Sequence, residues 1–236
     1  MGSGRVIIYT VEERVATIVL NRPERLNAWT PIMARELRET LYDAGEREDV
    51  SVIVLTGAGR SFCAGADLRL LDGTLEAPGH TSSALNDPLG ECSFIRSVAK
   101  PIIGAINGSA AGLGLALALY CDIRFAAENA VFITSFGPRG QIAEHGIARL
   151  LRRLMGSACA SGASFSSPCI SAAQALQCGL VTRVCEPDKL LQEAKSFALS
   201  LAQNASPRSL EAIKRQIYVS ADQSLEEALG IADMRE

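Results

Sequence analysis

The stretch KPIIGAINGSAAGLGLALALYCDIRFAAENAVF, residues 100–132, decides the fold class of this chain. It opens with KPIIGAING, a short apolar run that ends in glycine and is typical of a strand covered on both faces. The uncharged segment AGLGLALALYC follows and predicts a helix that is buried along its length. DIRFAAENAVF then predicts two further short strands. Buried strands that alternate with a buried helix indicate an α/β fold.

The sequence before this stretch extends the same pattern. Residues 5–11 and 15–20 are rich in β-branched side chains and predict a hairpin. Thr30, which is followed by proline, predicts the start of a helix over residues 31–48. SVIVLTG, at residues 51–57, predicts a second buried strand that ends in glycine.

The sequence after it becomes mainly helical. SAAQ, which starts at Ser171, predicts a capping box, and GLVTRV predicts a last strand. Pro207 predicts the first turn of another helix. We therefore expect a core over residues 1–186 and a helical region over residues 187–236.

Composition and charge exclude several classes of function. The chain has 236 residues and a net charge of −3, without the basic stripe that a nucleic-acid partner normally requires. The start of the chain lacks the apolar core of a signal peptide, and no later segment has a charge-free run long enough to span a membrane. We expect a cytoplasmic protein with no nucleic-acid or membrane partner.

Cysteine and histidine usage gives no indication of a metal site. The seven cysteines are scattered without a CxxC pair, which favours reduced structural thiols, and Cys63 is interpreted as a small core residue. The two histidines, His80 and His145, stand far apart without metal-ligand spacing. No metal is therefore predicted.

Two glycine-bearing segments each follow an apolar strand. They are GAGRSFCAGADL and NGSAAGLGLALAL. Glycine at a strand end lets the backbone turn tightly, and a helix that starts there directs free N–H groups toward a ligand. Two such turns side by side would direct two N–H groups at one oxygen, which is an oxyanion hole that stabilises charge on a carbonyl.

Other glycine motifs fit less well. A dinucleotide fingerprint would need a third glycine where Leu117 stands, and neither a P-loop lysine nor a G-x-S-x-G elbow is present. The residues alone leave two interpretations equally open, an acyl-transfer or enolate-type site and plain tight turns.

Four segments, in order, resemble the enoyl-CoA hydratase/isomerase (crotonase) family. They are NRPERLNAW, VLTGAGRSFCAGADL, the opening stretch, and SAAQALQCGLVTRV. The resemblance implies a spiral of β-β-α units with a C-terminal helical region that forms homotrimers or dimers of trimers. It also implies an acyl-CoA thioester as ligand, with CoA as part of the substrate and no separate cofactor. Members of the family usually continue past SLEEALGIADMRE with a segment that helps to close the CoA site.

The resemblance also assigns site residues by position. The backbone N–H groups of Ala66 and Leu113 would form the oxyanion hole, with Leu113 replacing a common glycine. The residues that would line the CoA and substrate path are Arg25, Leu26, Ala28, Ala64, Asp67, Leu68, Gly112 and Phe136. Arg25 would face a phosphate or adenine, or else be solvated. For Asp67 the favoured interpretation is that it holds the turn.

The departures from the family pattern select the catalytic group. The two glutamates of the hydratases correspond here to Ala116 and Phe136, and neither residue can accept a proton. GQIAEHG is similar to the G-Q-x-x-E segment of single-glutamate enoyl-CoA isomerases and places Glu144 as the base. His145 is interpreted as a packing neighbour.

Three alternatives stay open at this point. An acid in the first turn of a helix is stabilised by the helix dipole, by about 0.3–1 kcal/mol, and Glu144 would then need no catalytic role. The chain would otherwise be a hydratase that works with one carboxylate, or a crotonase-fold protein that binds acyl-CoA without catalysis.

Overall fold

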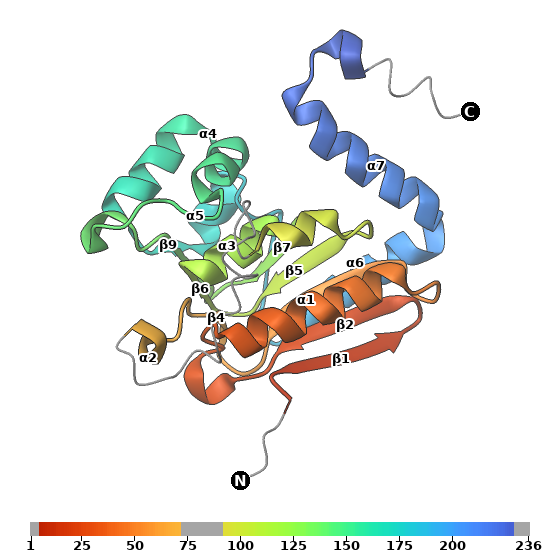
Figure 1. The fold of residues 1–236 in the computed structure, drawn as a ribbon, viewed down its shortest axis with the longest axis horizontal. Helices are drawn as coiled ribbons and strands as arrows, with labels where there is room; N and C mark the ends of the chain where they lie inside the picture. The colour runs from red at the N-terminus through yellow and green to blue at the C-terminus, as the bar shows by residue number, and fades with distance from the viewer. Residues whose placement is uncertain (1–4, 72–91, 229–236) are drawn as a thin grey trace.

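The computed structural model describes residues 5–71 and 92–228 of the chain. Figure 1 shows a larger sheet flanked by helices, a smaller sheet beside it, and a C-terminal helix that projects from the body. The larger sheet has the order β1-β2-β3-β5-β7-β10. Its strands are β1 (Ile7–Glu12), β2 (Val15–Leu20), β3 (Val52–Gly57), β5 (Ile102–Ile106), β7 (Ile123–Ala127) and β10 (Arg183–Cys185).

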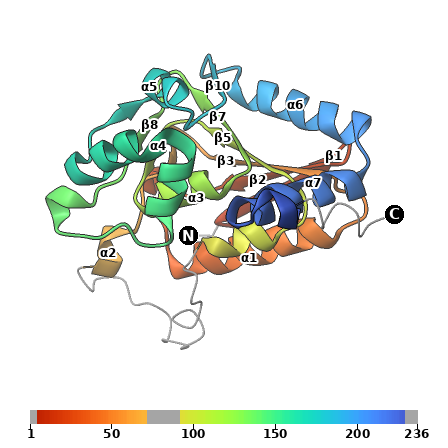
Figure 2. The ribbon, with the colours of Figure 1, turned by 90° about the horizontal axis from the view of Figure 1, so that it is seen from above.

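The larger sheet begins with the predicted hairpin. β1 and β2 pair antiparallel with Ile7 opposite Leu20, whereas every later neighbour pairs parallel. Every residue of β3 and β5 is buried, as their continuous apolar sequences predicted. Figure 2 shows α1 (Pro31–Glu46) and α6 (Leu190–Asn204) on opposite faces of this sheet. The parallel strands are therefore shielded from water on both sides.

Local capping sets two of the predicted helix starts. The Thr30 hydroxyl accepts a hydrogen bond from the N–H of Met33 at 3.2 Å, and α1 begins at Pro31. Ser171 forms a reciprocal capping box with Gln174 at the start of α5 (Ala172–Gln177). Both starts were predicted from sequence and are confirmed.

The smaller sheet has the order β4-β6-β8-β9, and three of these four strands, β4, β6 and β9, were missed from sequence. Its strands are β4 (Ser61–Cys63), β6 (Ser109–Ala111), β8 (Val131–Ile133) and β9 (Ile170–Ser171). β4 and β6 have three residues each, too few to show a period of two. These two strands stabilise each other through parallel pairing, which is a tertiary contact.

Successive units place one strand in each sheet and then a helix. β3 and β4 lead to α2 (Leu68–Leu71), β5 and β6 lead to α3 (Leu113–Tyr120), and β7 and β8 lead through η3 (Gly137–Arg139) to α4 (Ile147–Ser166). This repetition is the predicted spiral of β-β-α units. In α4 the helix is interrupted at Gly156, whose φ of 75° is not helical.

In the predicted C-terminal helical region, α6 and α7 have different roles. α6 packs on β3 and β5 and buries Leu190, Ala194, Ala198 and Ala202, so it covers the core. α7 (Pro207–Val219) instead leaves the body of the molecule (Figure 1) and exposes Ile213 and Ile217. Oligomerisation through this region stays a prediction.

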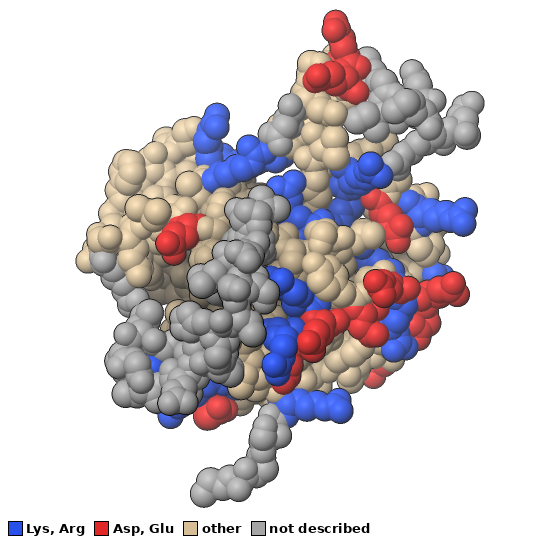
Figure 3. All heavy atoms as spheres, viewed as in Figure 1, with Lys and Arg blue, Asp and Glu red and all other residues tan. Residues whose placement is uncertain are grey.

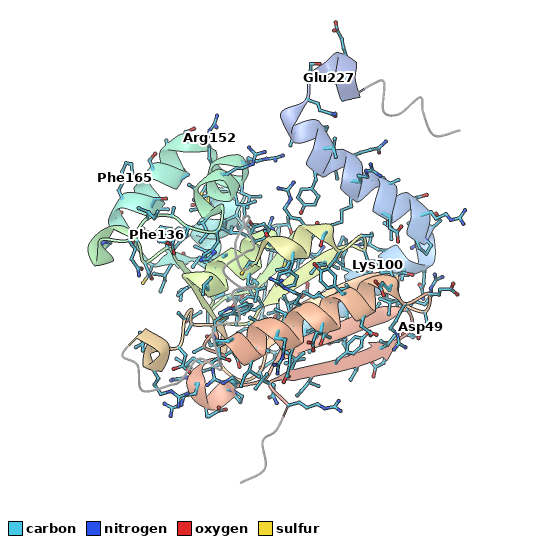
Figure 4. All side chains as sticks on the ribbon, in the orientation of Figure 1. Asp49, Lys100, Phe136, Arg152, Phe165 and Glu227 are labelled. Carbon is cyan, nitrogen blue, oxygen red and sulfur yellow. The ribbon has the colours of Figure 1, made fainter. Side chains whose placement is uncertain are left out.

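Polar contacts from the second half of α7 hold this helix against the core. The Lys214 ammonium lies 2.8 Å from Asp122 Oδ2, and the Tyr218 hydroxyl donates to Asp122 Oδ1 at 2.6 Å. Asp122 also accepts from the N–H of Ile102 at the start of β5. Asp122 is therefore structural, and it connects the core sheet to α7. Lys100, labelled at this junction in Figure 4, accepts a further hydrogen bond from Lys214 at its carbonyl.

Candidate active site

The two glycine turns lie side by side. Each follows one strand of the parallel pair β4–β6, in which Cys63 is opposite Ala110. A Cβ placed on Gly65 would lie 2.8 Å from the carbonyl oxygen of Ala111 and 3.8 Å from the nitrogen of Leu113. The first turn therefore contacts the start of α3 directly, and the two predicted N–H groups belong to adjoining turns.

Backbone conformation leaves both N–H groups available to a ligand. Gly65 has a φ of 94° and Gly112 a φ of 50°, values that residues with a side chain rarely adopt. Leu113 is the first residue of α3, so its N–H has no partner within the helix. Among the described residues, neither the N–H of Ala66 nor that of Leu113 donates a hydrogen bond to another protein group.

Close packing fixes the start of α3. A Cβ on Gly114 would lie 2.0 Å from the carbonyl oxygen of Cys63, so only glycine lets the helix approach β4 this closely. Cys63 itself is fully buried, and burial raises the pKa of its thiol to about 11. Its predicted role as a small core residue is confirmed.

The loop over residues 22–29 is hydrogen-bonded to the first turn. The carbonyl of Leu26 accepts from the N–H of Ala64 at 3.1 Å, and the N–H of Trp29 donates to the carbonyl of Gly65 at 2.7 Å. Leu26, Ala28 and Ala64 are each partly exposed along this contact, and Arg25 is exposed. The structure thus brings four of the predicted CoA-contacting residues to one edge, next to the N–H of Ala66.

Asn27 holds this loop in place and was missed from sequence. It is fully buried with a φ of 54°, and its side-chain amide donates to the carbonyls of Ala58 and Ser61 at 2.9 and 2.7 Å. Its side-chain oxygen accepts from the N–H of Arg22 at 2.8 Å. The sequence feature that could have identified Asn27 is its residue type, because asparagine tolerates the left-handed conformation that this position of the NRPERLNAW segment adopts.

Asp67 forms ion pairs with two arginines. Its Oδ2 lies 3.0 Å from Arg22 Nη2 and 2.9 Å from Arg69 Nη2, and its side chain is only 6% exposed. Hydrogen bonds from Arg69 and then Arg22 hold the pKa of the Asp67 carboxyl well below its ordinary value, against the opposing effect of burial. Asp67 therefore holds the turn. Arg22, which also donates to the carbonyl of Ala28, was missed because its partner is 45 residues away.

The predicted acid–histidine pair lies in the loop before α4. Because α4 begins at Ile147, the placement of Glu144 in a first helical turn was wrong. The reason is local: His145 and Gly146 have φ values of 55° and 72°, which no α-helix contains. The N–H of Glu144 donates to the carbonyl of Ile142, and its carbonyl accepts from Ile147, so the loop is tightly turned.

The Glu144 side chain is accessible. It is 67% exposed, and its Oε2 lies 3.9 Å from His145 Nε2. No arginine or lysine whose side chain the structure describes lies within ion-pair distance of it. By contrast, Ala116 is fully buried in α3 and Phe136 is 8% exposed, so the positions of the two hydratase glutamates are apolar.

The chain from Phe136 to Glu144 starts at the second glycine turn. The N–H of Gly112 donates to the carbonyl of Ile133, and the carbonyl of Phe136 accepts from the N–H of Gln141, both within 3.1 Å. Figure 4 shows Phe136 on the α4 side of the molecule, where Phe165 is also labelled. Leu68, on the other side of the first turn, is 63% exposed.

A cavity of about 1030 Å³ lies behind the Glu144 loop, between α7 and the core. Tyr120 and Gly146 form part of its wall, and its cationic lining residues are Arg96, Arg149, Arg208, Lys214 and Arg215. Figure 3 shows basic side chains gathered between α7 and the rest of the molecule.

Within residues 5–71 and 92–228, no group of three or more His, Cys, Asp or Glu side chains is placed to hold a metal ion. His80 lies outside those ranges. In the same part of the chain, no helix has both the length and the apolar character needed to cross a membrane.

Comparison with known proteins identifies the family. Residues 10–234 match the enoyl-CoA hydratase/isomerase family. A 1,2-epoxyphenylacetyl-CoA isomerase of Escherichia coli (strain K12) is 39% identical over 200 residues, which cover 83% of this chain and 76% of that protein. A probable enoyl-CoA hydratase of Rhizobium meliloti (strain 1021) is 34% identical over 226 residues, which cover 94% of this chain and 86% of that protein.

A solved structure supports the same family assignment. A monofunctional enoyl CoA isomerase from M. smegmatis superposes with a TM-score of 0.79 at 32% identity, and the match covers 96% of this chain and 99% of that one. The chain belongs to the enoyl-CoA hydratase/isomerase family and has its crotonase fold.

Proposed function

We propose that this acyl-CoA enzyme moves the double bond of an enoyl-CoA thioester from position 3 to position 2. One observation carries the proposal. On the two glycine turns and residues 133–146, the acids are Asp67 and Glu144; only Glu144 is accessible, and it has no ion pair with an arginine whose side chain the structure describes. A reaction that needs a single mobile carboxylate fits this arrangement.

The proposed mechanism is a proton shuttle. The Glu144 carboxylate removes a proton from C2 of the 3-enoyl thioester, and the electrons of that C–H bond pass into a dienolate. The N–H groups of Ala66 and Leu113 donate hydrogen bonds to the thioester oxygen, where the negative charge accumulates. The Glu144 carboxyl then returns the proton to C4, which leaves the double bond between C2 and C3. No atom is gained or lost, and CoA is part of the substrate.

Hydration is the second candidate. It is favoured by the names of several relatives, which include a short-chain-enoyl-CoA hydratase and a crotonyl-CoA hydratase. In this reaction Glu144 would have to activate water and also supply the proton to carbon, because Ala116 and Phe136 carry no acid. A third candidate is acyl-CoA binding without turnover.

The test offers the purified full chain 3-enoyl-CoA and 2-enoyl-CoA in separate assays. We expect conversion of the 3-enoyl substrate, with turnover in Glu144→Gln lowered by about 10²–10⁴-fold, the usual contribution of a general acid–base group. Glu128→Gln is the matched control, because Glu128 is an exposed glutamate in the turn between β7 and β8. It should retain the original rate.

Each other outcome identifies a competing candidate. Hydration of 2-enoyl-CoA without isomerisation of 3-enoyl-CoA would overturn the proposal in favour of a hydratase. Binding of both thioesters without turnover would favour the non-catalytic candidate. Unchanged turnover in Glu144→Gln would remove Glu144 from the mechanism.

A further inference from the structure

The loop that carries Glu144 is held at the adjacent residue. The Tyr120 hydroxyl donates a hydrogen bond to the carbonyl oxygen of His145 at 2.8 Å. The consecutive left-handed residues His145 and Gly146 turn the chain there, and Glu144 accepts the N–H of Ile147. The bond from Tyr120 therefore connects this irregular loop to a regular element of the core.

That element is α3, which also begins at the oxyanion turn. α3 starts at Leu113 and ends at Tyr120, and all its residues from Gly114 onward are buried. The seven residue-to-residue steps from Leu113 to Tyr120 rise about 10 Å along the helix axis, and a short buried helix has little freedom to bend. One rigid helix thus presents the N–H of Leu113 at its first residue and contacts the Glu144 loop at its last residue.

Gly146 makes room for this contact. A Cβ on Gly146 would lie 3.0 Å from the Tyr120 hydroxyl oxygen, tighter than most Cβ contacts, and the φ of 72° already disfavours a side chain. The glycine after His145 therefore lets the loop approach the phenol closely.

We propose that Tyr120 is the positioning residue for Glu144, setting the distance between the base and the oxyanion hole through the carbonyl of His145. This inference rests on the proposed role of Glu144 in catalysis. Tyr120 is not a catalytic residue, because it acts through His145. Its role follows from general acid–base geometry, in which the base must lie within hydrogen-bond reach of the proton it removes.

The test is Tyr120→Phe, which removes the hydroxyl and retains the ring. A displacement of about 1 Å in a reacting group can lower a rate by about 10²-fold. We therefore expect kcat for the enoyl-CoA substrate to fall by about 10–100-fold. KM should change less than about twofold, because the substitution leaves the loop over residues 22–29 and the two glycine turns unchanged. In the Glu144→Gln background, the same substitution should lower the residual rate no further.

Tyr218→Phe is the matched control. It removes another part-buried phenol hydroxyl, one that donates to Asp122 in the contact between α7 and the core and not to the Glu144 loop. We expect its kcat to stay within about twofold of the original while its unfolding midpoint falls, since the partly buried acceptor Asp122 loses a donor. A purely structural role of Tyr120 would produce this same pattern.

The outcomes separate the two proposals. If Glu144→Gln abolishes turnover but Tyr120→Phe retains the original kcat, the positioning role is overturned and the catalytic assignment survives. An equal loss from Tyr120→Phe in the presence and absence of Glu144 would also overturn the positioning role. If Glu144→Gln retains full turnover, the proposed function is overturned, and the positioning role that rests on it is overturned as well.

Discussion

Asp67, on the first glycine turn, and Glu144, in the loop before α4, are two carboxylates whose surroundings differ in nearly every respect. Asp67 is 6% exposed and lies about 3 Å from two guanidinium groups. Glu144 is 67% exposed, and its Oε2 lies 3.9 Å from Nε2 of His145. The backbone around Asp67 is joined to the 22–29 loop, whereas the Glu144 loop is attached to α3 through the carbonyl of His145.

The difference separates structural from chemical roles. A carboxylate that accepts several charge-assisted hydrogen bonds is stabilised in its ionised form and is a poor proton acceptor. A carboxylate that has no cationic partner can exchange a proton with a bound substrate. Whether neighbouring cations bind each acid therefore decides which of the two can act as a base.

The largest effect on stability is expected for Asp67→Asn. The substitution leaves Arg22, whose side chain is 12% exposed, without its carboxylate partner. Breaking one side of a buried ion pair typically costs about 3–5 kcal/mol, and the partial exposure of Arg69 places the expected loss near the lower figure. Urea unfolding followed by circular dichroism would measure it. A loss below about 0.5 kcal/mol would show that Asp67 is no more structural than a surface acid.

A smaller effect is expected from pH. Because the pKa of Asp67 is lower in the folded chain than its ordinary value of about 3.9, its ion pairs contribute fully above that value. Their contribution is lost as the pH falls through the folded-state pKa. The difference in unfolding free energy between wild type and Asp67→Asn should thus be constant near neutral pH and shrink below about pH 4. A difference that grows on acidification would contradict the assignment.

The smallest effect on stability is expected for Glu144→Gln. The side chain is exposed and has no ion pair with a described lysine or arginine, so the free energy of unfolding should change by no more than about 0.5 kcal/mol. The same urea experiment measures it beside Asp67→Asn. A loss comparable to that of Asp67→Asn would mean that Glu144 stabilises the fold and would remove the contrast between the two acids.

Much of the fold could be predicted because its signals are local. The apolar strands β3 and β5, the buried helix α3 and the caps at Thr30 and Ser171 each depend on residues within a few positions of one another. The glycines of the two turns were likewise visible. What could not be read locally was the start of α4, because two residues with positive φ separate Glu144 from the helix.

The features of the candidate site also separate into those with a local sequence signal and those that depend on tertiary contacts. The sequence by itself determined which residues end the strands, which positions lack an acid, and which acid precedes α4. Only the tertiary structure decided that the two turns adjoin, that Arg22 binds Asp67, and that Tyr120 contacts the carbonyl of His145. The physical reason is sequence separation. Caps and strand patterns are set by near neighbours, whereas these contacts join residues 25 to 48 positions apart and exist only when both sheets have formed.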